Sequence, residues 1–380
     1  MPKKIFLIAG EASGDLQAAA LIRALKKQNP NLHFRGLGGE LMAREGMELV
    51  YDLTKEAALG LGDVLKKYFT FKRIFDQALA DVKTYKPDVI ILVDYPGFNL
   101  RFAKKLNKAF PIIYYISPQI WAWGKQRIHL IRRCINHLIV FFKFESELYE
   151  REQIPVTWIG HPLVDLAKPS KNRSELRKEF GAGSDSEKLI SLLPGSRESE
   201  VKRMLPEMLA VAQLLHRRSP HTRFLLSQSP TLPASVYQKI VLKFKPEFAL
   251  SAIQNRSFDI LHAGDFSMVS SGTATLEATL AASPFVILYK TAGSTFFLGR
   301  WLVQIPYIGL VNVVAGRKIV PEFIQHEIHA ETIAQEAAYL LDHEDLKEKM
   351  KSDLKMVSEK LGEPGGADRA AKAVLQFLNV

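Results

Sequence analysis

Short apolar runs alternate with amphipathic segments along most of the chain. Runs rich in Val, Ile, Leu and Phe, which are typical of buried strands, lie at residues 4–10, 33–38, 88–94, 111–117, 137–142 and 156–160. Between them, apolar residues recur at helical spacing in residues 15–28, 63–85, 98–109 and 124–133. Strands that alternate with helices in this way indicate a parallel β-sheet covered by helices on both faces.

The pattern is interrupted once and then restarts. Residues 160–188 are rich in Pro, Gly, Ser and charged residues, a composition typical of a domain boundary. Further strands are expected at 189–195, 222–227, 266–272 and 284–289, and residues 329–380 are helical by pattern. We therefore predict an α/β protein of two Rossmann-like domains, with ligands in the cleft between the carboxyl ends of their sheets. The expected parts are residues 1–165, residues 166–350 and C-terminal helices at 351–380 that can cross back to the first domain.

Charge and cysteine content narrow the classes of partner and the compartment. The net charge of +11 is uneven, with +8 in residues 1–160 and +3 in the remainder, which predicts an anionic partner for the first half. Cys134 is the only cysteine, so an internal disulfide and a multi-cysteine metal site are excluded. Glu11 ends the first apolar run too early for a signal peptide, and no apolar stretch reaches the roughly 18 residues of a membrane span. We expect a cytoplasmic protein that at most lies on a membrane.

Two turns in the first half place polar groups after strands. In "AGEASGD" (9–15), glycines allow a tight turn before a helix with free backbone N–H groups, although a plain turn that only needs glycine remains an alternative. In "LVDYPGFN" (92–99), Asp94 closes an apolar strand, where desolvation would raise its pKa and suit a general base. The alternative for Asp94 is a helix cap. The residues of the first turn that we assign to a ligand cleft are Gly10, Glu11, Ser13, Gly14 and Asp15.

Two turns in the second half are candidate phosphate sites. In "LLPGSRESE", Ser196 and Arg197 begin a helix, and the guanidinium can bind a phosphate with two hydrogen bonds. In "SSGTATLE", small residues again begin a helix, and a carboxylate one turn later can hold sugar hydroxyls. A solvated arginine and a capping glutamate remain the alternatives. The candidates in the second turn are Ser271, Gly272, Thr273 and Glu277. An acid in one domain and two anion-binding turns in the other suit transfer from a nucleotide-activated donor. No D-x-D sequence occurs, so we expect neither a metal nor a cofactor.

Two segments combine aromatic and basic residues. "YISPQIWAW" (115–123) lies within residues 95–144, which carry nine Lys and Arg residues and no Asp or Glu. Trp121 and Trp123 are suited to a membrane interface or to the wall of an acyl-chain pocket, and Trp121 is assigned to the cleft. Packing of the two tryptophans between the domains is the alternative. The segment 59–75 is typical of a basic amphipathic helix on a membrane surface, and a helix covering the sheet is the alternative. Its expected membrane contacts are Leu65, Tyr68, Phe69, Phe71 and Phe75. No nucleic-acid-binding motif accompanies the basic residues, so we expect no nucleic-acid partner.

Seven segments together resemble one known family. "GEASGD", "VDYPGFN", "YISPQIWAW", "IGHPL", "LLPGSR", "SGTATLE" and "GRKIVPEFIQ" follow the order and spacing of the bacterial lipid-A-disaccharide synthases, over essentially the whole chain. The resemblance implies a GT-B fold and an inverting glycosyltransferase. It implies that UDP-2,3-diacylglucosamine and 2,3-diacylglucosamine 1-phosphate (lipid X) give a β-1′,6-linked disaccharide 1-phosphate and UDP at the cytoplasmic face of the inner membrane. Another GT-B UDP-N-acetylglucosamine transferase or an epimerase is the alternative.

The resemblance also implies roles for particular residues. The family's essential aspartate and arginine match Asp94 and Arg197, and an asparagine near the donor matches Asn312 in "LVNVVAGR". We expect Asp94 to deprotonate or orient the acceptor's 6-hydroxyl. The expected diphosphate ligands are Arg197, Ser271 and Thr273, with Glu277 and Asn312 toward the ribose or uracil. Some members carry a second acid where this chain has Gly97, so that acid's role does not transfer. His161 in "IGHP" is either a cleft residue or a structural hinge residue. Some members form homodimers, and the sequence leaves the oligomeric state open.

Overall fold

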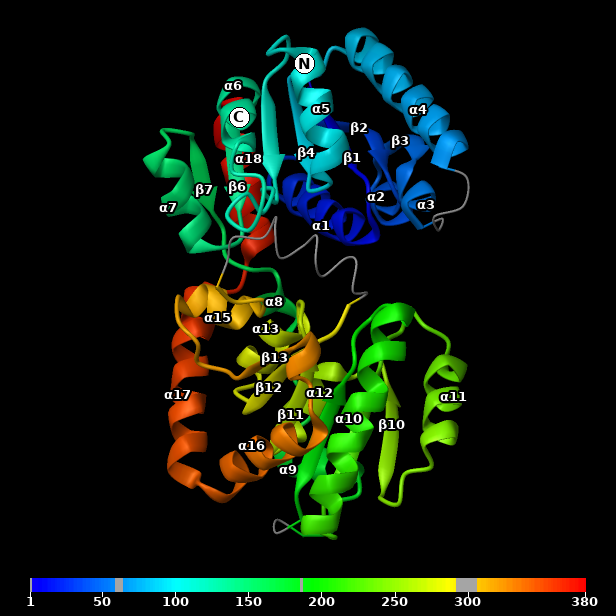
Figure 1. Ribbon diagram of the computed structural model, residues 1–380. Helices are drawn as coiled ribbons and strands as arrows, with labels where there is room; N and C mark the ends of the chain where they lie inside the picture. Colours follow the sequence, from blue (N-terminus) through cyan, green and yellow to red (C-terminus); the bar gives the residue numbers. More distant parts are fainter. Residues whose placement is uncertain (1, 59–63, 185–186, 292–305) are drawn as a thin grey trace. The chain divides into compact units, whose positions relative to one another are not determined.

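The computed structural model describes residues 2–58, 64–184, 187–291 and 306–380, with the side chains of 56–58 and 64–68 outside that description. Contacts within the chain divide it into two compact units. The first unit contains Met1–Pro162 and Gly362–Val380, and the second contains Leu163–Leu361. The chain therefore leaves the first unit once and returns to it for its last helix. In Figure 1, each unit is a sheet enclosed by its own helices.

The first unit has a seven-stranded parallel sheet with the strand order β3-β2-β1-β4-β5-β6-β7. The order reverses direction between β1 and β4, which is the switch point where open parallel sheets bind ligands. The strands are β1 (Lys3–Ala9), β2 (Leu32–Gly38), β3 (Glu48–Asp52), β4 (Val89–Val93), β5 (Ile112–Tyr115), β6 (His137–Val140) and β7 (Val156–Trp158). The helices are α1 (Ala12–Gln28), α2 (Glu40–Arg44), α3 (Leu53–Ala58), α4 (Val64–Tyr85), α5 (Pro96–Leu106), α6 (Arg127–Cys134), α7 (Lys143–Arg151) and α18 (Gly366–Leu378).

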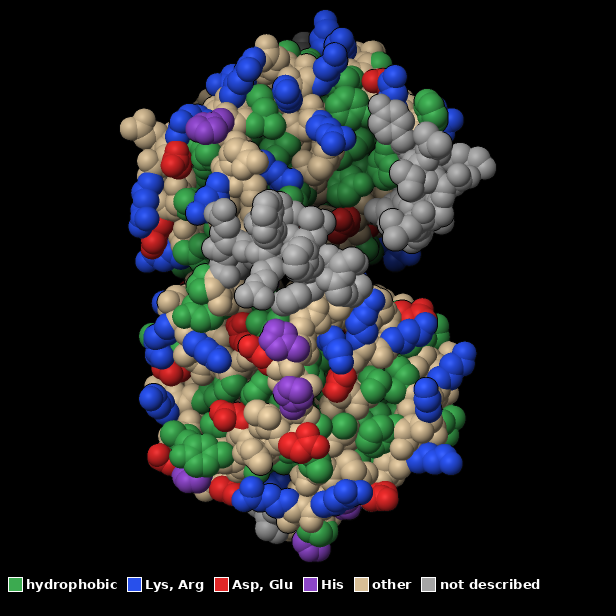
Figure 2. Space-filling view, in the orientation of Figure 1, with side chains coloured by type: hydrophobic (Ala, Val, Ile, Leu, Met, Phe, Trp, Pro, Cys, Tyr) green, Lys and Arg blue, Asp and Glu red, His purple; other side chains and the backbone are tan. Residues whose placement is uncertain are grey.

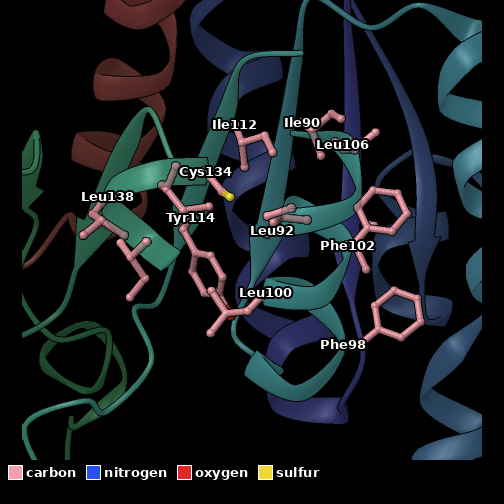
Figure 3. Close-up of a cluster of buried hydrophobic side chains, with 14 of the residues drawn as sticks. Ile90, Leu92, Phe98, Leu100, Phe102, Leu106, Ile112, Tyr114, Cys134 and Leu138 are labelled. Atoms are coloured by element: carbon pink, nitrogen blue, oxygen red, sulfur yellow. The ribbon is translucent and has the colours of Figure 1, made fainter. Parts of the chain in front are cut away.

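The core of the first unit lies between the sheet and its helices. The central strand β4 reads Val-Ile-Ile-Leu-Val, and all five side chains are buried because helices cover both faces. Figure 3 shows Leu92 of this strand with Tyr114, Leu100 and Phe102 in the buried cluster. Helix α18 packs on α1 through small buried residues, so the end of the chain completes the first unit. The core thereby fixes the strand ends from which the candidate site residues extend.

The second unit has a six-stranded parallel sheet with the strand order β10-β9-β8-β11-β12-β13. Its helix α9 (Arg173–Glu179) begins with a capping box, because Asn172 and Glu175 each accept a hydrogen bond from the other's backbone N–H. The strands are β8 (Leu189–Leu193), β9 (Arg223–Gln228), β10 (Leu250–Gln254), β11 (Phe266–Ser270), β12 (Phe285–Tyr289) and β13 (Glu322–Ile324). The helices are α8 (Leu163–Leu166), α9 (Arg173–Glu179), α10 (Glu198–Arg218), α11 (Ala234–Phe244), α12 (Ser257–Ala263), α13 (Ala274–Leu280), α15 (Leu310–Ala315), the 3-10 turn Gln325–Glu327, α16 (Ala330–Asp342) and α17 (Glu344–Lys360).

The predicted architecture of two parallel-sheet α/β domains is confirmed, and each expected apolar run forms a strand. Three strands lie outside the predicted set, namely β3, β10 and β13, and all three are at sheet edges. The contacts place the boundary between residues 162 and 163, close to the expected 165, and return the chain to the first unit at residue 362 rather than at 351. Of the C-terminal helices, α17 therefore belongs to the second unit and α18 to the first.

Candidate active site

The second unit contains a cavity of about 360 Å³ at the carboxyl ends of four adjacent strands. Hydroxyl, amide and glycine residues supply most of its wall, a composition that suits a polar ligand such as a nucleotide. The lining includes Gly195, Ser196, Arg197, Glu200, Ser227, Gln228, Ser229, Asn255, Ser257, Ser270, Ser271, Gly272, Thr273 and Glu277. Every donor-site residue predicted from the two phosphate-binding turns lines this cavity, and the structure thus brings the two turns together.

Glycine is required at the two turns that border the cavity. Gly195 and Gly272 have φ of 112° and 138°, in the region that side chains with a Cβ rarely adopt. A Cβ on Gly195 would lie 2.6 Å from Glu200 Oε2. A Cβ on Gly272 would have no neighbour within 4 Å, so the backbone there borders open space. A ligand can therefore approach the main chain of the second turn directly.

Arg197 lies at the start of α10 and is the most exposed cation of the cavity wall, with 79% of its side chain accessible. Its Nη1 is 3.0 Å from Glu200 Oε1, and the other Glu200 oxygen accepts from the N–H groups of Ser196 and Arg197. Glu200 thus occupies the donors that the sequence assigned to a phosphate. A phosphate that binds here would take the place of this carboxylate.

Glu277 lies one turn into α13 and faces the cavity. Burial raises the pKa of Glu277, and a hydrogen bond of 2.8 Å from Ser257 Oγ opposes that rise. Ser271 donates to the Ile308 carbonyl at 3.2 Å, while Ser270 Oγ is buried and has no partner among the described residues. A buried hydroxyl without a partner is costly, so Ser270 is a candidate to bind a ligand or a water.

Asn312 is predicted near the donor, but the structure places it inside the fold. It is fully buried in α15, where its amide donates to Val320 and Glu322 and its oxygen accepts from Ile319 and Val320. All of its side-chain polar atoms are therefore used to join α15 to the start of β13. Asn312 is absent from the cavity lining and supports the loop behind it.

Asp94 lies in the first unit, directly after β4, in a strained turn. Asp94 and Tyr95 have φ of 46° and 45°, two successive left-handed residues that are not glycine. The turn is held by the Asp94 carbonyl, which accepts from Tyr114 Oη at 2.6 Å and from Asn99 Nδ2 at 2.8 Å. Burial raises the pKa of the Asp94 carboxyl to about 6, and the charge of Glu11 adds to the rise. A carboxylate with this pKa is suited to general-base catalysis near neutral pH.

The "AGEASGD" turn lies beside Asp94, and its residues have separate roles. A Cβ on Gly10 would lie 2.1 Å from the Tyr95 ring, so only glycine fits against that side chain. Glu11 and Ser13 are exposed, whereas Gly14 is buried against β4. Asp15 is buried, and its carboxylate accepts from three N–H groups at the start of α2, namely those of Gly39, Leu41 and Met42. Asp15 therefore stabilises the fold, and Glu11 is the acid of this turn that acts on Asp94.

Trp121 and His161, the other two residues assigned to the cleft, are both held against aromatic rings. Trp121 packs edge-on against Phe144 and donates from Nε1 to the buried Glu145 at 3.0 Å. His161 contacts the rings of Phe141 and Phe142, and burial lowers its pKa to about 4. A histidine with this pKa is neutral at pH 7. His161 lies within the first unit, one residue before its boundary.

The five residues expected at a membrane all belong to helix α4, but the described ones have different environments. Phe69 is 65% exposed, while Phe71 and Phe75 pack against the buried cluster, and Phe75 contacts the rings of Phe98 and Phe102. The side chains of Leu65 and Tyr68 lie outside the described residues. In Figure 2, Lys and Arg side chains are spread over the visible face of the first unit among apolar ones. Phe71 and Phe75 thus serve the core, and Phe69 is the described member that faces solvent.

Sequence reasoning missed several residues that the structure puts at these sites. Gln228, Asn255 and Ser257 line the cavity but follow strands without any glycine-rich turn to mark them. Glu200 and Glu145 also gave no signal, because a glutamate near a helix start usually only caps that helix. For Gln228 and Asn255, the available signal was their position at strand ends.

Among the residues that the structure describes, no group of three or more His, Cys, Asp or Glu side chains could hold a metal ion. None of the described helices combines the length and the apolar content needed to cross a bilayer.

Solved structures with this fold include UDP-sugar enzymes. A putative UDP-N-acetylglucosamine 2-epimerase from Listeria monocytogenes matches with a TM-score of 0.65 and 14% identity, over 100% of this chain and 97% of that one. A glycosyltransferase from Rickettsia africae matches with a TM-score of 0.59 and 11% identity, over 99% and 98% of the two chains. At such identities the likeness shows the fold alone, which is the predicted GT-B fold.

Sequence comparison identifies the family. The sequence model of the family described as lipid-A-disaccharide synthetase matches residues 5–377. The lipid-A-disaccharide synthase of Syntrophus aciditrophicus is 37% identical over 377 residues, covering 99% of this chain and 98% of the relative. That of Coxiella burnetii is 36% identical over 373 residues, covering 98% of each. The chain therefore belongs to the lipid-A-disaccharide synthetase family.

Proposed function

We propose that this protein joins UDP-2,3-diacylglucosamine to 2,3-diacylglucosamine 1-phosphate, releasing UDP and a β-1′,6-linked acylated disaccharide 1-phosphate. The observation that carries the proposal is the family match over residues 5–377. The reaction needs a base for a hydroxyl and a site for a departing diphosphate. The first unit offers Asp94, and the second offers the cavity with Arg197 in its wall.

The chemistry proposed for the first unit is proton removal from the acceptor. The Asp94 carboxylate takes the proton of the 6-hydroxyl while that oxygen attacks C1 of the donor sugar from the face opposite UDP. The configuration at C1 is inverted, and the electron pair of the broken C1–O bond leaves with UDP. A base whose pKa is about 6 is mostly ionised at pH 7 and still has useful basicity, which supports Asp94 in this role.

The chemistry proposed for the second unit is binding and release of UDP. The Arg197 guanidinium and the hydroxyls of Ser271 and Thr273 would hold the diphosphate, and Ser196 and Gly272 would offer backbone N–H groups. Preorganised donors of this kind stabilise charge that develops on a leaving group. Glu277 would accept from the ribose hydroxyls, and Asn312 would act by holding the adjacent loop.

The proposal extends to the cytoplasmic face of the inner membrane, where both acylated substrates would reside. The net charge of +8 in residues 1–160 would favour an anionic surface, at about 1 kcal/mol per cation close to it. Phe69 is the exposed apolar side chain of α4 that could enter such a surface. Flotation with anionic vesicles tests this step, and equal retention of wild type and Phe69→Ser would remove the residue from the account.

A turnover assay tests the whole proposal. Wild type and Asp94→Ala are supplied with both acylated substrates in neutral detergent micelles, and products are identified by mass spectrometry. We expect a disaccharide 1-phosphate and UDP from wild type and almost none from the variant. The rival function is that of an epimerase or another UDP-N-acetylglucosamine enzyme of the same fold. Consumption of soluble UDP-N-acetylglucosamine, with no disaccharide formed, would replace our proposal with that rival.

A further inference from the structure

The loop between β5 and α6 begins in a strained conformation and is joined to helix α7 by hydrogen bonds. Ile116 has a φ of 68°, an outlier for a β-branched residue. Glu145 Oε1 accepts from Ser117 Oγ at 3.1 Å and from Trp121 Nε1 at 3.0 Å. One turn later on α7, the Tyr149 hydroxyl donates to the Pro118 carbonyl at 3.3 Å. These contacts fix the shape of residues 116–121.

The fixed loop continues into a pair formed by the exposed Trp123 and the half-buried Arg127. Trp123 is 42% exposed, and the Arg127 guanidinium carbon lies 3.9 Å from the centre of its ring. Gly124 between them has a φ of 75°, and a Cβ there would come within 3.2 Å of Arg127 Nε. The loop is therefore shaped so that the guanidinium lies over the indole ring. A guanidinium held in this way keeps N–H donors available to an anionic ligand.

Arg127 differs from the other arginines of the first unit in its surroundings. Among the described residues of that unit, it is the arginine that is half-buried and yet has no hydrogen-bonding or ion-pair partner for its side chain. Arg35 and Arg369, which are also half-buried, bind carboxylates or carbonyls. A partly desolvated cation without a counter-charge is unfavourable, so its natural partner is an anionic ligand.

Tyr114 interacts electrostatically with both Arg127 and the candidate base Asp94. Burial raises the pKa of Tyr114 well above its usual value, the charge of Asp94 adds to the rise, and the charge of Arg127 opposes it. The same hydroxyl donates to the Asp94 carbonyl at 2.6 Å. Asp94 N also donates to the Tyr115 carbonyl at 3.0 Å, just before the strained loop. Asp94 and Arg127 therefore both act on one side chain at the carboxyl edge of this sheet.

We propose that Arg127, stacked on Trp123, binds the phosphate monoester of the sugar acceptor and makes the enzyme selective for a phosphorylated acceptor. This inference rests on the proposed function. In 2,3-diacylglucosamine 1-phosphate, the ring oxygen joins C1, which carries the phosphate, to C5, which carries the C6 hydroxymethyl group. A base at the 6-hydroxyl and a cation at the 1-phosphate must therefore lie within one sugar ring of each other. The loop would be the element that sets this spacing.

The test compares two acceptors that differ only in the phosphate. The acceptors are 2,3-diacylglucosamine 1-phosphate and 2,3-diacylglucosamine, presented in neutral detergent micelles with a saturating donor. For Arg127→Gln we expect KM for the phosphorylated acceptor to rise about 10- to 100-fold, the loss typical of hydrogen bonds to a charged group. KM for UDP-2,3-diacylglucosamine and all constants for the dephosphorylated acceptor should stay near wild type. If the dephosphorylated acceptor is not turned over, its inhibition constant against the phosphorylated one takes the place of KM.

Two further variants sharpen the test. Trp123→Ala should give a smaller loss of the same selectivity, about 3- to 10-fold, because it removes the stacking support and not the charge. Arg101 is an exposed arginine of α5 in the same basic region. Arg101→Gln should leave the selectivity at the wild-type value. Loss of selectivity in Arg101→Gln as large as in Arg127→Gln would reduce the effect to general positive charge and overturn the proposal.

The remaining outcomes separate this inference from the proposed function. If wild type forms no disaccharide, both the proposed function and the phosphate site are wrong. Normal turnover with equal losses for the two acceptors in Arg127→Gln would overturn the phosphate site alone. A lipid headgroup offers the same phosphate chemistry, so the variant is also floated with vesicles of neutral and anionic phospholipid. Weakened retention on anionic vesicles with unchanged acceptor selectivity would assign Arg127 to the membrane instead.

Discussion

The carboxyl edges of the two parallel sheets share one architecture but differ in the burial of their charged side chains. In the first unit, Asp94 lies in a strained, partly buried turn, and burial brings its pKa to about 6. In the second unit, the edge opens into a cavity of about 360 Å³ with an exposed arginine. Burial at the first edge raises the pH at which the Asp94 carboxyl loses its proton. At the second edge, the exposed Arg197 is paired with Glu200, which an anionic ligand would displace. From the proposed function we therefore expect that proton transfer at the first edge and nucleotide binding at the second are separable by mutation.

The largest effect is expected at Asp94. Asp94→Asn keeps the size of the side chain, and asparagine tolerates the left-handed conformation of this turn. We expect kcat to fall by about 10²- to 10⁴-fold, the contribution typical of a general base, with UDP affinity unchanged. Steady-state kinetics and UDP titration measure the two quantities. Asp76→Asn, at an exposed position of α4, is the control, and a comparable loss in that variant would contradict the assignment.

The same substitution should separate stability from activity. The folded-state pKa of about 6 lies above the usual value near 3.9, so the folded protein binds the extra proton between those pH values. The resulting stability is present below pH 4 and is lost as pH rises through 6. Asp94→Asn removes a cost of at most about 3 kcal/mol above pH 6, reduced because the side chain is partly exposed. Denaturant unfolding should therefore show a more stable variant at pH 8 and little difference at pH 4.

The next effect belongs to the other edge. Arg197→Ala should weaken UDP binding by about 10- to 100-fold, because a hydrogen-bonded charge on the diphosphate contributes about 1.5–3 kcal/mol. The pH at which activity falls on the acid side should stay where it is in wild type. Calorimetric titration with UDP and a pH series measure both. Arg217→Ala, near the other end of the same helix, is the control. A shifted acid limb in Arg197→Ala would mean that the two edges are not separable.

The fold could be predicted from the sequence wherever a strand is buried on both faces. Strand β4 and the last five residues of β1 are uninterrupted apolar runs, because helices cover both sides of a parallel sheet. The three missed strands are sheet edges, where solvent replaces one neighbour and polar residues are tolerated. β10, for example, reads Leu-Ser-Ala-Ile-Gln and is partly exposed throughout. The hydrophobic pattern depends on burial, so it does not reveal strands that are only partly buried.

The candidate sites were predictable where the backbone itself demands a residue type. Gly195 and Gly272 follow strands and have conformations that favour glycine, so the turns could be found in sequence. Glu145 could not, because its partners Ser117 and Trp121 are distant in sequence. The contacts of Glu200 are local, but they are those of an ordinary helix cap and do not by themselves mark a site. Asn312 shows the opposite difficulty. The resemblance assigned it to the donor, but a sequence motif does not reveal that all its side-chain polar atoms are used inside the fold.

A smaller effect is expected from Glu145, which holds the loop between β5 and α6 through two hydrogen bonds. Glu145→Ala leaves Ser117 Oγ and Trp121 Nε1 without their acceptor, at about 1 kcal/mol each. We expect kcat/KM for the acceptor to fall about tenfold, with UDP affinity unchanged and altered tryptophan fluorescence. Glu145→Gln keeps one oxygen as an acceptor and should recover most of the activity. Glu147→Ala, at an exposed position of the same helix, is the control, and an equal loss in that variant would attribute the effect to α7 as a whole.

The smallest effect is expected from Glu11, which acts on Asp94 only through its charge. Burial is the larger cause of the raised pKa of Asp94, and the negative charge of Glu11 is the second. Glu11→Gln should therefore lower the pKa of Asp94 while leaving it above the usual value. Because the ionised carboxylate is the base, the acid limb of kcat/KM should move to lower pH, and activity at pH 5 should rise a few-fold relative to the value at pH 8. A pH series for wild type and variant measures this, with Glu40→Gln as the exposed control. A shift to higher pH would show that Glu11 stabilises the ionised form of Asp94, and the electrostatic account of the first edge would be wrong.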